Sequence, residues 1–423
     1  MDIDQTLLAQ AQAAKAAARK LAGLSTVVKN RALESIAEAL IARQDEILAA
    51  NTQDVERARD SGLAEAPLNR LRLSPEKLQG IASDVRTVAR LEDPVGEVID
   101  GRRLPNGLQV SRRRVPLGVL AAVFESRPNV TIDIAALCLK SGNACIIRGG
   151  SEAIRSNTVL ARVAREAQVE AGVPEGALQF IENTDRALVG QMLSLREYID
   201  IVVPRGGAEL IRFVAENARM PVLTGGVGVC HTYVDRDADL EKAVNIAVNA
   251  KTRNWSICNA LDTLLVHASV APAYLPRIAQ GWSEKGVELR ADRRALALLP
   301  QSNGIRIVPA APDDYGQEFL APVAAVRVVD SLDEALDHID QYGTGHSDAI
   351  VTEDFSAARR FTDEVDTAVV YVNASTQFTD GAQFGLGAEI FDSTQKTIDR
   401  GPVGLREITT YKRVVLGEGQ TRT

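Results

Sequence analysis

The sequence predicts two tandem α/β domains, each built on a doubly wound, mainly parallel sheet, together with a small β arm. Short apolar runs alternate with stretches of helical periodicity, which is typical of βαβ units. This alternation occurs twice, and the second series begins near Val229. A chain of 423 residues is also too long for a single hydrophobic core. These observations indicate two domains of similar architecture.

A helical leader is expected up to about Leu91. Apolar residues recur there at intervals of three and four, as in Leu33, Ile36 and Leu40. Ser74 followed by Pro75 predicts a helix start, because Ser is a good N-cap and Pro is tolerated at the first helical position. Helices therefore precede the first sheet.

Two segments have strand-like composition but no obvious partner within either domain. Residues 96–114 predict a hairpin around a Pro-Asn-Gly turn at 105–107, with an exposed Arg run at 112–114. Residues 408–415, near the end of the chain, predict a further strand. Because a two-stranded ribbon is marginally stable alone, we expect the hairpin to pack on another part of the protein.

The elements of each α/β series follow from the apolar runs and the helical stretches between them. In the first series we expect strands at 119–124, 144–147, 178–181 and 201–203, with a helix at about 152–171. In the second series we expect strands at 230–234, 263–266, 305–308, 323–329, 349–352 and 368–372, with helices from 240 and near 271.

The composition excludes several classes of function. The chain has 48 Lys plus Arg and 56 Asp plus Glu, and the resulting net charge of −8 argues against nucleic acid or an anionic membrane as the main partner. Four cysteines without a CxxC pair and only four histidines suggest neither a disulfide framework nor a metal site. The acidic start and the absence of a long apolar run predict a cytoplasmic protein.

The cysteines are candidates for chemistry, although free cysteine is also among the most buried residue types. Cys138 lies in an apolar helical stretch and Cys145 in an apolar strand, so both are interpreted as packing residues. Cys258 lies between a polar, basic approach at 251–254 and the start of a new element at 259–262. Backbone N–H groups at such a start can stabilise a thiolate and an oxyanion. Local sequence leaves Cys258 open as either a nucleophile or a core residue.

Several longer motifs carry a resemblance to a known family. They are FESRPNVT at 124–131, KSGN at 140–143, VPRGG at 203–207, CNA at 258–260, GHSDAI at 345–350 and QFGLGAE at 383–389. In this order the chain resembles the γ-glutamyl phosphate reductases, and more widely the aldehyde dehydrogenase superfamily. The resemblance implies a cofactor-binding domain at 1–95, 117–227 and 376–402, a catalytic domain at 228–375 and an oligomerisation arm at 96–116 and 403–423.

The resemblance also implies a reaction. Cys258 would attack the carbonyl carbon of L-glutamyl 5-phosphate, and hydride from NADPH would reduce the resulting thioester to glutamate 5-semialdehyde. Oxidising relatives usually carry a Glu two residues before a Gly-Gly pair, as a base that activates water. Leu223 stands at that place before Gly225, so the thioester would be protected from water. The alternative is a related aldehyde dehydrogenase that oxidises a semialdehyde to the free acid.

The same resemblance assigns site residues. Asn129 would steady the oxygen of the intermediate beside the Cys258 backbone N–H, although an ordinary turn Asn after Pro is equally expected. Cations and polar groups would hold the substrate, and a phosphate-binding loop, an Arg and a Glu would hold NADPH/NADP. The expected substrate-binding residues are Ser126, Arg127, Lys251, Asn259, His346, Ser347 and Asp348. The expected cofactor-binding residues are Arg148, Gly149, Ser151, Pro204, Arg205, Gly206, Gly207, Gly225 and Glu318.

Two partners follow from the resemblance besides the substrate. The arm implies a homo-oligomer, a dimer or larger. The unstable acyl phosphate implies glutamate 5-kinase, which makes it, as a partner.

Overall fold

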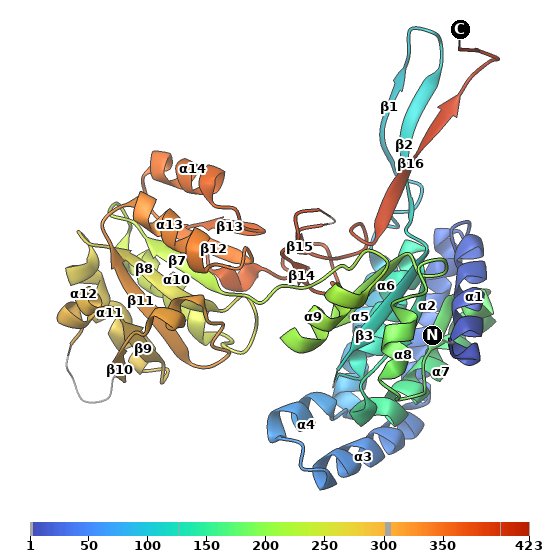
Figure 1. Cartoon of the computed structure of the whole chain (residues 1–423), viewed down its shortest axis with the longest axis horizontal. Helices are drawn as coiled ribbons and strands as arrows, with labels where there is room; N and C mark the ends of the chain where they lie inside the picture. The colour runs from blue at the N-terminus through green and yellow to red at the C-terminus, as the bar shows by residue number, and fades with distance from the viewer. Residues whose placement is uncertain (1–2, 126, 301–305, 398, 423) are drawn as a thin grey trace. The chain divides into compact units, whose positions relative to one another are not determined.

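The chain forms two compact units in a computed structural model that describes residues 3–125, 127–300, 306–397 and 399–422. The first unit comprises Met1–Thr224, Gly385–Ile390 and Val403–Thr423, and the second comprises Gly225–Phe384 and Phe391–Pro402. Each unit contains its own parallel sheet and its own helices (Figure 1). The expected α/β class with two domains is therefore confirmed.

The leader is helical, as predicted. Ser74 caps the last leader helix, because its side chain accepts a hydrogen bond from the backbone N–H of Lys77, and Pro75 occupies the first helical position. The apolar face of that helix buries Leu78 and Val85. The leader helices are α1 (Gln5–Leu21), α2 (Thr26–Ala42), α3 (Gln44–Asp60), α4 (Glu65–Leu71) and α5 (Pro75–Arg90).

A four-stranded parallel sheet with the order β5-β4-β3-β6 forms the centre of the first unit. All of β3 is buried, which explains its uninterrupted apolar sequence. The strands are β3 (Val119–Phe124), β4 (Ala144–Arg148), β5 (Leu178–Phe180) and β6 (Ile201–Arg205). The connecting helices are α6 (Asn129–Ser141), α7 (Ile154–Glu170), α8 (Ala187–Met192) and α9 (Ala208–Asn217), with short 3₁₀ turns η1 (Ser151–Ala153) and η2 (Glu175–Ala177).

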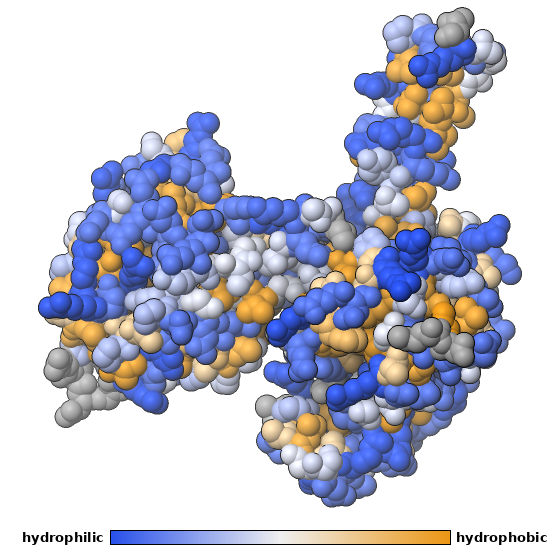
Figure 2. Space-filling model, viewed as in Figure 1, coloured by the Kyte–Doolittle hydropathy of each residue, from blue (hydrophilic) through white to orange (hydrophobic). Residues whose placement is uncertain are grey.

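The hairpin and the C-terminal strand, for which the sequence offered no partner, pair with each other. β1 (Val98–Arg103), β2 (Gln109–Pro116) and β16 (Thr409–Leu416) form an antiparallel three-stranded sheet with β2 in the centre. This arm projects from the helical part of the first unit (Figure 1). Apolar side chains are visible along it among charged ones (Figure 2).

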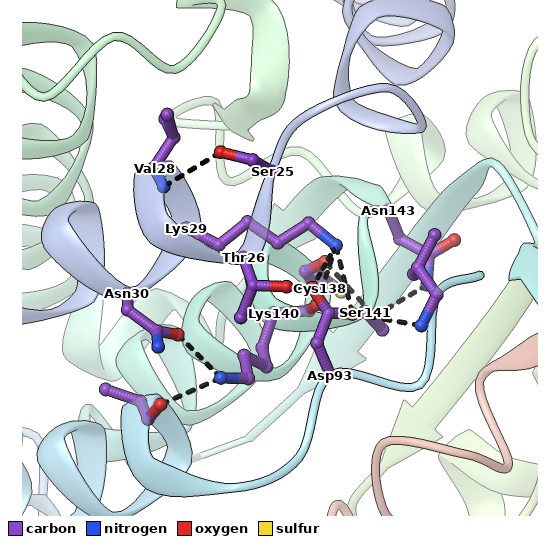
Figure 3. A network of polar contacts seen from close by, with 12 residues as sticks. Ser25, Thr26, Val28, Lys29, Asn30, Asp93, Cys138, Lys140, Ser141 and Asn143 are labelled. Carbon is purple, nitrogen blue, oxygen red and sulfur yellow. Dashed lines mark hydrogen bonds and ion pairs between the residues drawn. The ribbon is translucent and has the colours of Figure 1, made fainter. Parts of the chain in front are cut away.

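The KSGN motif at 140–143 anchors this arm and the leader. The side-chain amide of Asn143 donates to the Ile408 carbonyl at 2.8 Å, directly before β16, and its oxygen accepts from the Gly118 N–H. Buried Lys140 donates to Asn30 Oδ1 and to the Ala89 carbonyl, within the polar network that Figure 3 shows. Gly142 has a φ of 76°, which disfavours any residue with a side chain. The motif is therefore structural.

Lys29 and Asp93 complete this network. The Lys29 ammonium lies 3.0 Å from the Asp93 carboxylate and also donates to the Lys140 carbonyl (Figure 3). Its side chain is fully buried, so the paired carboxylate and the carbonyl replace its lost hydration.

The second unit has a seven-stranded parallel sheet with the order β10-β9-β11-β8-β7-β12-β13. Its strands are β7 (Cys230–Val234), β8 (Leu261–His267), β9 (Glu288–Ala291), β10 (Ile307–Pro309), β11 (Val323–Val329), β12 (Ser347–Val351) and β13 (Val369–Val372). Its helices are α10 (Leu240–Thr252), α11 (Ala271–Ser283), α12 (Arg293–Leu298), α13 (Leu332–Tyr342) and α14 (Phe355–Glu364), with 3₁₀ turns η3 (Pro312–Gly316) and η4 (Thr376–Phe378). The short strand β9 was missed, because it carries Glu288 and Arg290 within only four residues.

Two domain boundaries differ from the expectation. The first domain was expected to reach residue 227, but the second unit begins at Gly225. Residues 376–402 were expected in the first domain, but most of them belong to the second unit, and only Gly385–Ile390 joins the first. The hydroxyl of Thr376 donates to the Asn259 carbonyl at 2.6 Å, and the short strand β14 (Asp392–Ser393) bridges to Gly225. β14 also pairs with β15 (Gly401–Pro402). These long-range contacts have no signature in the local sequence.

In the part of the chain that the structure describes, no helix combines the length and the apolar character needed to cross a membrane.

Candidate active site

Four neighbouring strands of the second sheet bring their amino ends together. The order β11-β8-β7-β12 places the residues that precede these strands along one edge. Glu318 precedes β11, Cys258 precedes β8, Gly228 precedes β7 and His346 precedes β12. Parallel strands present equivalent ends at the same edge, so segments far apart in the sequence converge here.

Cys258 occupies a turn directly before β8, and its side chain is partly exposed, whereas the other three cysteines are buried. Its Sγ lies 4.0 Å from Asp392 Oδ2. Its carbonyl oxygen accepts a hydrogen bond from the Cys230 thiol at 3.2 Å. Burial raises the pKa of Cys230 well above its ordinary value, so that thiol stays protonated. Cys258 is thus the accessible sulfur of the site.

Gly228 allows the backbone to pass close to the Cys258 turn. A Cβ at this position would lie 1.7 Å from the Cys258 carbonyl oxygen, so any side chain would displace the turn. The Gly228 N–H donates to Glu318 Oε1 at 3.2 Å. Burial raises the pKa of Glu318, and the hydrogen bond from Gly228 partly offsets this rise. Sequence reasoning missed Gly228, although it ends the GGVG run that begins at Gly225.

His346 and Asp392 lie beside the thiol. His346 Nε2 is 3.9 Å from Asp392 Oδ2, and His346 Nδ1 is 2.9 Å from the Ser347 hydroxyl. Burial lowers the pKa of His346 to about 4, so the ring is neutral at physiological pH. Asp392 was not among the predicted site residues, because it lies more than a hundred residues after Cys258 and just outside the motif at 383–389.

Three predicted substrate-binding residues are buried and engaged with protein groups. Asn259 donates its amide to the Thr379 carbonyl at 2.8 Å. Ser347 contacts the Thr379 hydroxyl at 2.7 Å, in addition to His346. Asp348 accepts from the backbone N–H of His231 and lies 3.0 Å from its ring. The geometry therefore favours a role in holding the Cys258 turn and β12, rather than direct contact with a substrate.

Lys251 is the predicted substrate cation whose placement differs most from the expectation. Its ammonium is fully buried at the end of α10 and lies 3.3 Å from Asp262 Oδ1. Burial lowers the pKa of Lys251 and raises that of Asp262, and the attraction between the two opposes both shifts. Breaking such a pair leaves an uncompensated buried charge. Lys251 therefore serves the core beneath the site.

Gly225, expected to contact the cofactor, forms an antiparallel bridge with Ser393. A Cβ on Gly225 would meet the Phe391 ring at 3.2 Å, and one on Gly226 would meet the Thr394 side chain at 2.4 Å. The Gly-Gly pair thus permits close packing that holds the Asp392 segment.

The predicted residues of the first unit lie at the carboxyl ends of its strands. Asn129 is the first residue of α6, and its amide donates to Asp133 Oδ2 at 2.8 Å. Arg127 is exposed, and Ser126 lies outside the described residues. Asn129 and Cys258 belong to different units, so a shared oxyanion contact stays a prediction.

The loop after β4 combines a buried guanidinium with a close backbone turn. Arg148 donates through one terminal nitrogen to the Thr184 carbonyl at 3.0 Å. Its buried Nε has no hydrogen-bond partner within the described ranges of the chain. A Cβ on Gly149 would lie 2.2 Å from the Asn157 amide nitrogen. Exposed Ser151 carries no charge, but its carbonyl accepts from Arg57 of α3. The Arg57 guanidinium is thus a second cation at this loop. It comes from a leader helix far away in the sequence, so no local pattern predicted it.

The segment Pro204-Arg205-Gly206-Gly207 connects β6 to α9, as expected for a phosphate-binding turn. Pro204 and Arg205 end the strand. The N–H of Gly207 donates to Glu125 Oε2 at 3.0 Å, so a carboxylate already caps this helix start. A Cβ on Gly206 would lie 2.5 Å from the same carboxylate.

Leu223 is fully buried in the first unit, and its N–H donates to the Val202 carbonyl. Val222, beside it, forms a parallel bridge with Val202. The position that would carry the water-activating Glu thus belongs to a packed strand end and holds no carboxylate.

The fold and the sequence are those of a known class of oxidoreductases. The sequence profile of the aldehyde dehydrogenase family matches residues 4–293 and 308–414. The chain therefore belongs to the aldehyde dehydrogenase family. Within it, the chain is 55% identical over 413 residues to a gamma-glutamyl phosphate reductase of Dehalococcoides mccartyi, covering 98% of this chain and 97% of that protein.

Two further relatives agree with this placement. A gamma-glutamyl phosphate reductase of Halothermothrix orenii is 51% identical over 422 residues, with both chains fully covered. The crystal structure of gamma-glutamyl phosphate reductase from Thermotoga maritima superposes with a TM-score of 0.96 at 48% identity, over 99% of this chain and 100% of that one. The resemblance to the γ-glutamyl phosphate reductases is thereby confirmed.

Proposed function

We propose that the chain catalyses the NADPH-dependent reduction of L-glutamyl 5-phosphate to L-glutamate 5-semialdehyde and phosphate, the second step of proline biosynthesis. The observation that carries this proposal is Cys258, the only partly exposed cysteine, held in a turn at the convergence of four strand ends. The names of the relatives support the substrate.

Cys258 acts as the nucleophile in this proposal. Its thiolate attacks the carbonyl carbon of the acyl phosphate, the C–O bond to phosphate breaks, and a thioester remains on Sγ. Phosphate is a good leaving group, so this step needs little help from a general acid. NADPH, when bound, would supply a hydride to the thioester carbon. The S–C bond then breaks, which releases the aldehyde and restores the thiolate.

The surroundings of Cys258 support protection of the thioester from water. A hydrolytic enzyme needs a base that activates water, and Leu223 offers none at the expected place. The proposal therefore favours reduction over the alternative, which is oxidation of a semialdehyde to the free acid.

The residues expected to hold the cofactor fit a dinucleotide with an additional phosphate. Arg148 retains an unpaired buried Nε, and Arg57 adds a second guanidinium beside Ser151. The N–H groups at the start of α9 would receive the pyrophosphate once Glu125 moves aside. Glu318 would hold the nicotinamide ribose.

The substrate anions require cations near Cys258. Lys251 is paired with Asp262, so Arg253 is the better candidate within the second unit, and Arg127 of the first unit stays a prediction. Arg253 is exposed in the segment that leads to Cys258, and its guanidinium donates to Gln377 Oε1 at 3.1 Å. A guanidinium can bind carboxylate or phosphate through two parallel hydrogen bonds.

The reverse reaction tests the proposal most directly. Purified protein with glutamate 5-semialdehyde, phosphate and NADP should form NADPH, and omission of phosphate should abolish the signal. Cys258→Ala should lower this rate by at least about 10³-fold with unchanged folding. Oxidation that proceeds equally well without phosphate would establish the alternative reaction.

The proposal includes two kinds of association, with further copies of this chain and with another enzyme. The exposed arm fits a homo-oligomer, and the short-lived acyl phosphate makes glutamate 5-kinase the partner to test for direct association.

A further inference from the structure

A thiol, an imidazole and a carboxylate converge in the second unit in a way that the proposed reaction does not require. Cys258 Sγ, His346 Nε2 and Asp392 Oδ2 all lie within 4.8 Å of one another. Sγ is 4.0 Å from the carboxylate oxygen, and Nε2 is 3.9 Å from it. The three donors come from three distant segments of the chain, which the sheet edge and the Gly225–Ser393 bridge bring together.

The imidazole is fixed and aimed into this cluster. His346 is 1% exposed, and its buried Nε2 has no hydrogen-bond partner among the residues that the structure describes. Its Nδ1 faces the Ser347 hydroxyl, which contacts Thr379, whose hydroxyl in turn contacts Tyr371 at 2.8 Å. This chain of contacts fixes the ring orientation. A buried ring nitrogen without a partner is unfavourable, and a bound cation would remove that cost.

The donor set and its spacing fit a particular cation. Zn²⁺ prefers four ligands at about 2.0–2.3 Å in tetrahedral geometry, which places the ligand atoms about 3.3–3.6 Å apart. The observed separations exceed this by a fraction of an ångström for the two pairs that involve Asp392. Thiolate and imidazole ligands favour Zn²⁺ over Mg²⁺ or Ca²⁺, which prefer oxygen ligands.

We propose that Zn²⁺ binds Cys258 Sγ, His346 Nε2 and Asp392 Oδ2, with water as the fourth ligand, and that it blocks the nucleophile reversibly. On binding, the thiol proton leaves to solvent and a zinc–sulfur bond replaces the S–H bond, without any electron transfer. The sulfur lone pair that would attack a carbonyl is then engaged by the metal. The site is therefore inhibitory.

Cys230 is not part of this cluster, although it is close. Its Sγ lies 3.9 Å from Nδ1 of His346, which is the opposite side of the ring from Nε2. The sequence suggested no metal site, because metal motifs are recognised by ligands close together in the chain. Here the ligands at 258, 346 and 392 meet only in the folded protein.

The first test is metal binding to the reduced full-length protein. Titration with Co²⁺ alone should produce a thiolate-to-cobalt absorption band in the near ultraviolet, which Zn²⁺ abolishes and Mg²⁺ does not. Cys258→Ala, His346→Asn and Asp392→Asn should each weaken binding by at least about 10-fold. Cys145→Ala and His267→Asn are matched controls that should bind like the wild type. A band of equal strength in Cys258→Ala would overturn the proposal.

The second test needs no variant and covers the case in which a buried substitution prevents folding. Iodoacetamide should alkylate Cys258 of the wild type, as mapped by peptide mass spectrometry, and Zn²⁺ should slow this by at least about 10-fold. Mg²⁺ should have no effect. Equal alkylation rates with and without Zn²⁺ would refute the site. The inhibitory role rests on the proposed function, but both tests measure binding, so they remain decisive even if the proposed reaction is wrong.

Discussion

At the level of single residues, accessibility separates Cys258 from the other cysteines. Cys138 and Cys145 are buried in a helix and a strand, as their apolar surroundings predicted. Cys230 is also buried and supports the Cys258 turn through its thiol. Only Cys258 combines partial exposure with a position outside regular structure. The exposure and backbone conformation around a thiol thus decide its chemical role, and the neighbouring residues in the sequence only suggested them.

Cofactor choice can be tested at Arg57 and Arg148. Arg148 ends β4, and the Arg57 guanidinium contacts the Ser151 carbonyl in the loop that follows. We therefore expect Arg57→Ala and Arg148→Ala each to raise the KM for NADPH by about 10-fold or more. The KM for NADH should change little, since NADH lacks the extra phosphate. Steady-state kinetics with both cofactors would measure this. Arg59→Ala, on an exposed position of the same helix, serves as the control. Equal losses with NADPH and NADH would argue against a phosphate contact.

The pH dependence of stability can be tested at Asp133. Burial raises the pKa of Asp133 to about 7, with Asn129 as hydrogen-bond partner and with Asp84 and Arg205 nearby. Between its unfolded value of about 3.9 and this value, the folded protein holds one more proton than the unfolded chain. This contribution to stability is therefore complete below about pH 4 and is lost as the pH rises through 7.

The substitution Asp133→Asn should remove the loss of folding stability that the wild type shows as the pH rises through 7. We expect the Tm of the variant to exceed that of the wild type by about 2 °C or more at pH 8, with a smaller difference at pH 5. Thermal unfolding followed by circular dichroism at both values would measure it. The exposed Asp60→Asn should keep the wild-type slope. An identical difference at pH 5 and pH 8 would contradict the assigned pKa.

At the level of elements, most strands and helices could be predicted from the sequence, whereas the order of the strands in each sheet could not. β3, β7 and β11 have the predicted bounds, because continuous apolar runs define buried parallel strands. β9 was missed because its alternation of charged and apolar residues is too short to recognise. The order β11-β8-β7-β12, which assembles the site, cannot be read from any local pattern.

The close passage of Gly228 beside the Cys258 turn gives a prediction at this level. Gly228→Ala would place a Cβ against the Cys258 carbonyl, and the turn must move by at least an ångström to relieve the overlap. Because a misplacement of this size can lower a rate by about 100-fold, we expect kcat to fall at least about 10-fold. Steady-state kinetics would measure the change.

Gly80→Ala is the matched control for this substitution. Gly80 lies within α5, and a Cβ there would meet no atom within 4 Å. The change should leave kcat unaltered and stabilise the protein by about 0.5–1 kcal/mol, because Ala is the better helix former. A Gly228→Ala enzyme with normal kcat would show that the turn tolerates the displacement.

At the level of the whole molecule, the arm exposes apolar surface that a monomer would leave in water. Exposed apolar side chains occur on β1 and β16, among them Val98, Tyr411, Val415 and Leu416. Such patches mark interaction surfaces. The side-chain amide of Asn143 donates to the Ile408 carbonyl at the base of this arm, which ties the arm to the turn after α6.

Assembly through the arm can be tested by adding charge to it. The double substitution Val415→Lys and Leu416→Lys should shift the protein to a smaller species, because burying two ammonium groups in an interface is costly. Size-exclusion chromatography with light scattering would measure the mass. Phe355→Lys, at a highly exposed position of α14 in the second unit, is the control. An unchanged mass in the arm variant would place the interface elsewhere.

The two α/β series, the helical leader and the strand composition of the arm could be predicted from the sequence, because periodicity is a local property. The family motifs singled out Cys258 as the proposed nucleophile. The tertiary structure decided which groups surround that sulfur. Gly228, Asp392 and Arg57 reach their sites from distant segments, and Lys251 proved to be a core residue paired with Asp262. These contacts depend on the order of the strands in the sheet and on which side chains become buried. Both bring together segments that are far apart in the sequence, so no local sequence pattern predicts them.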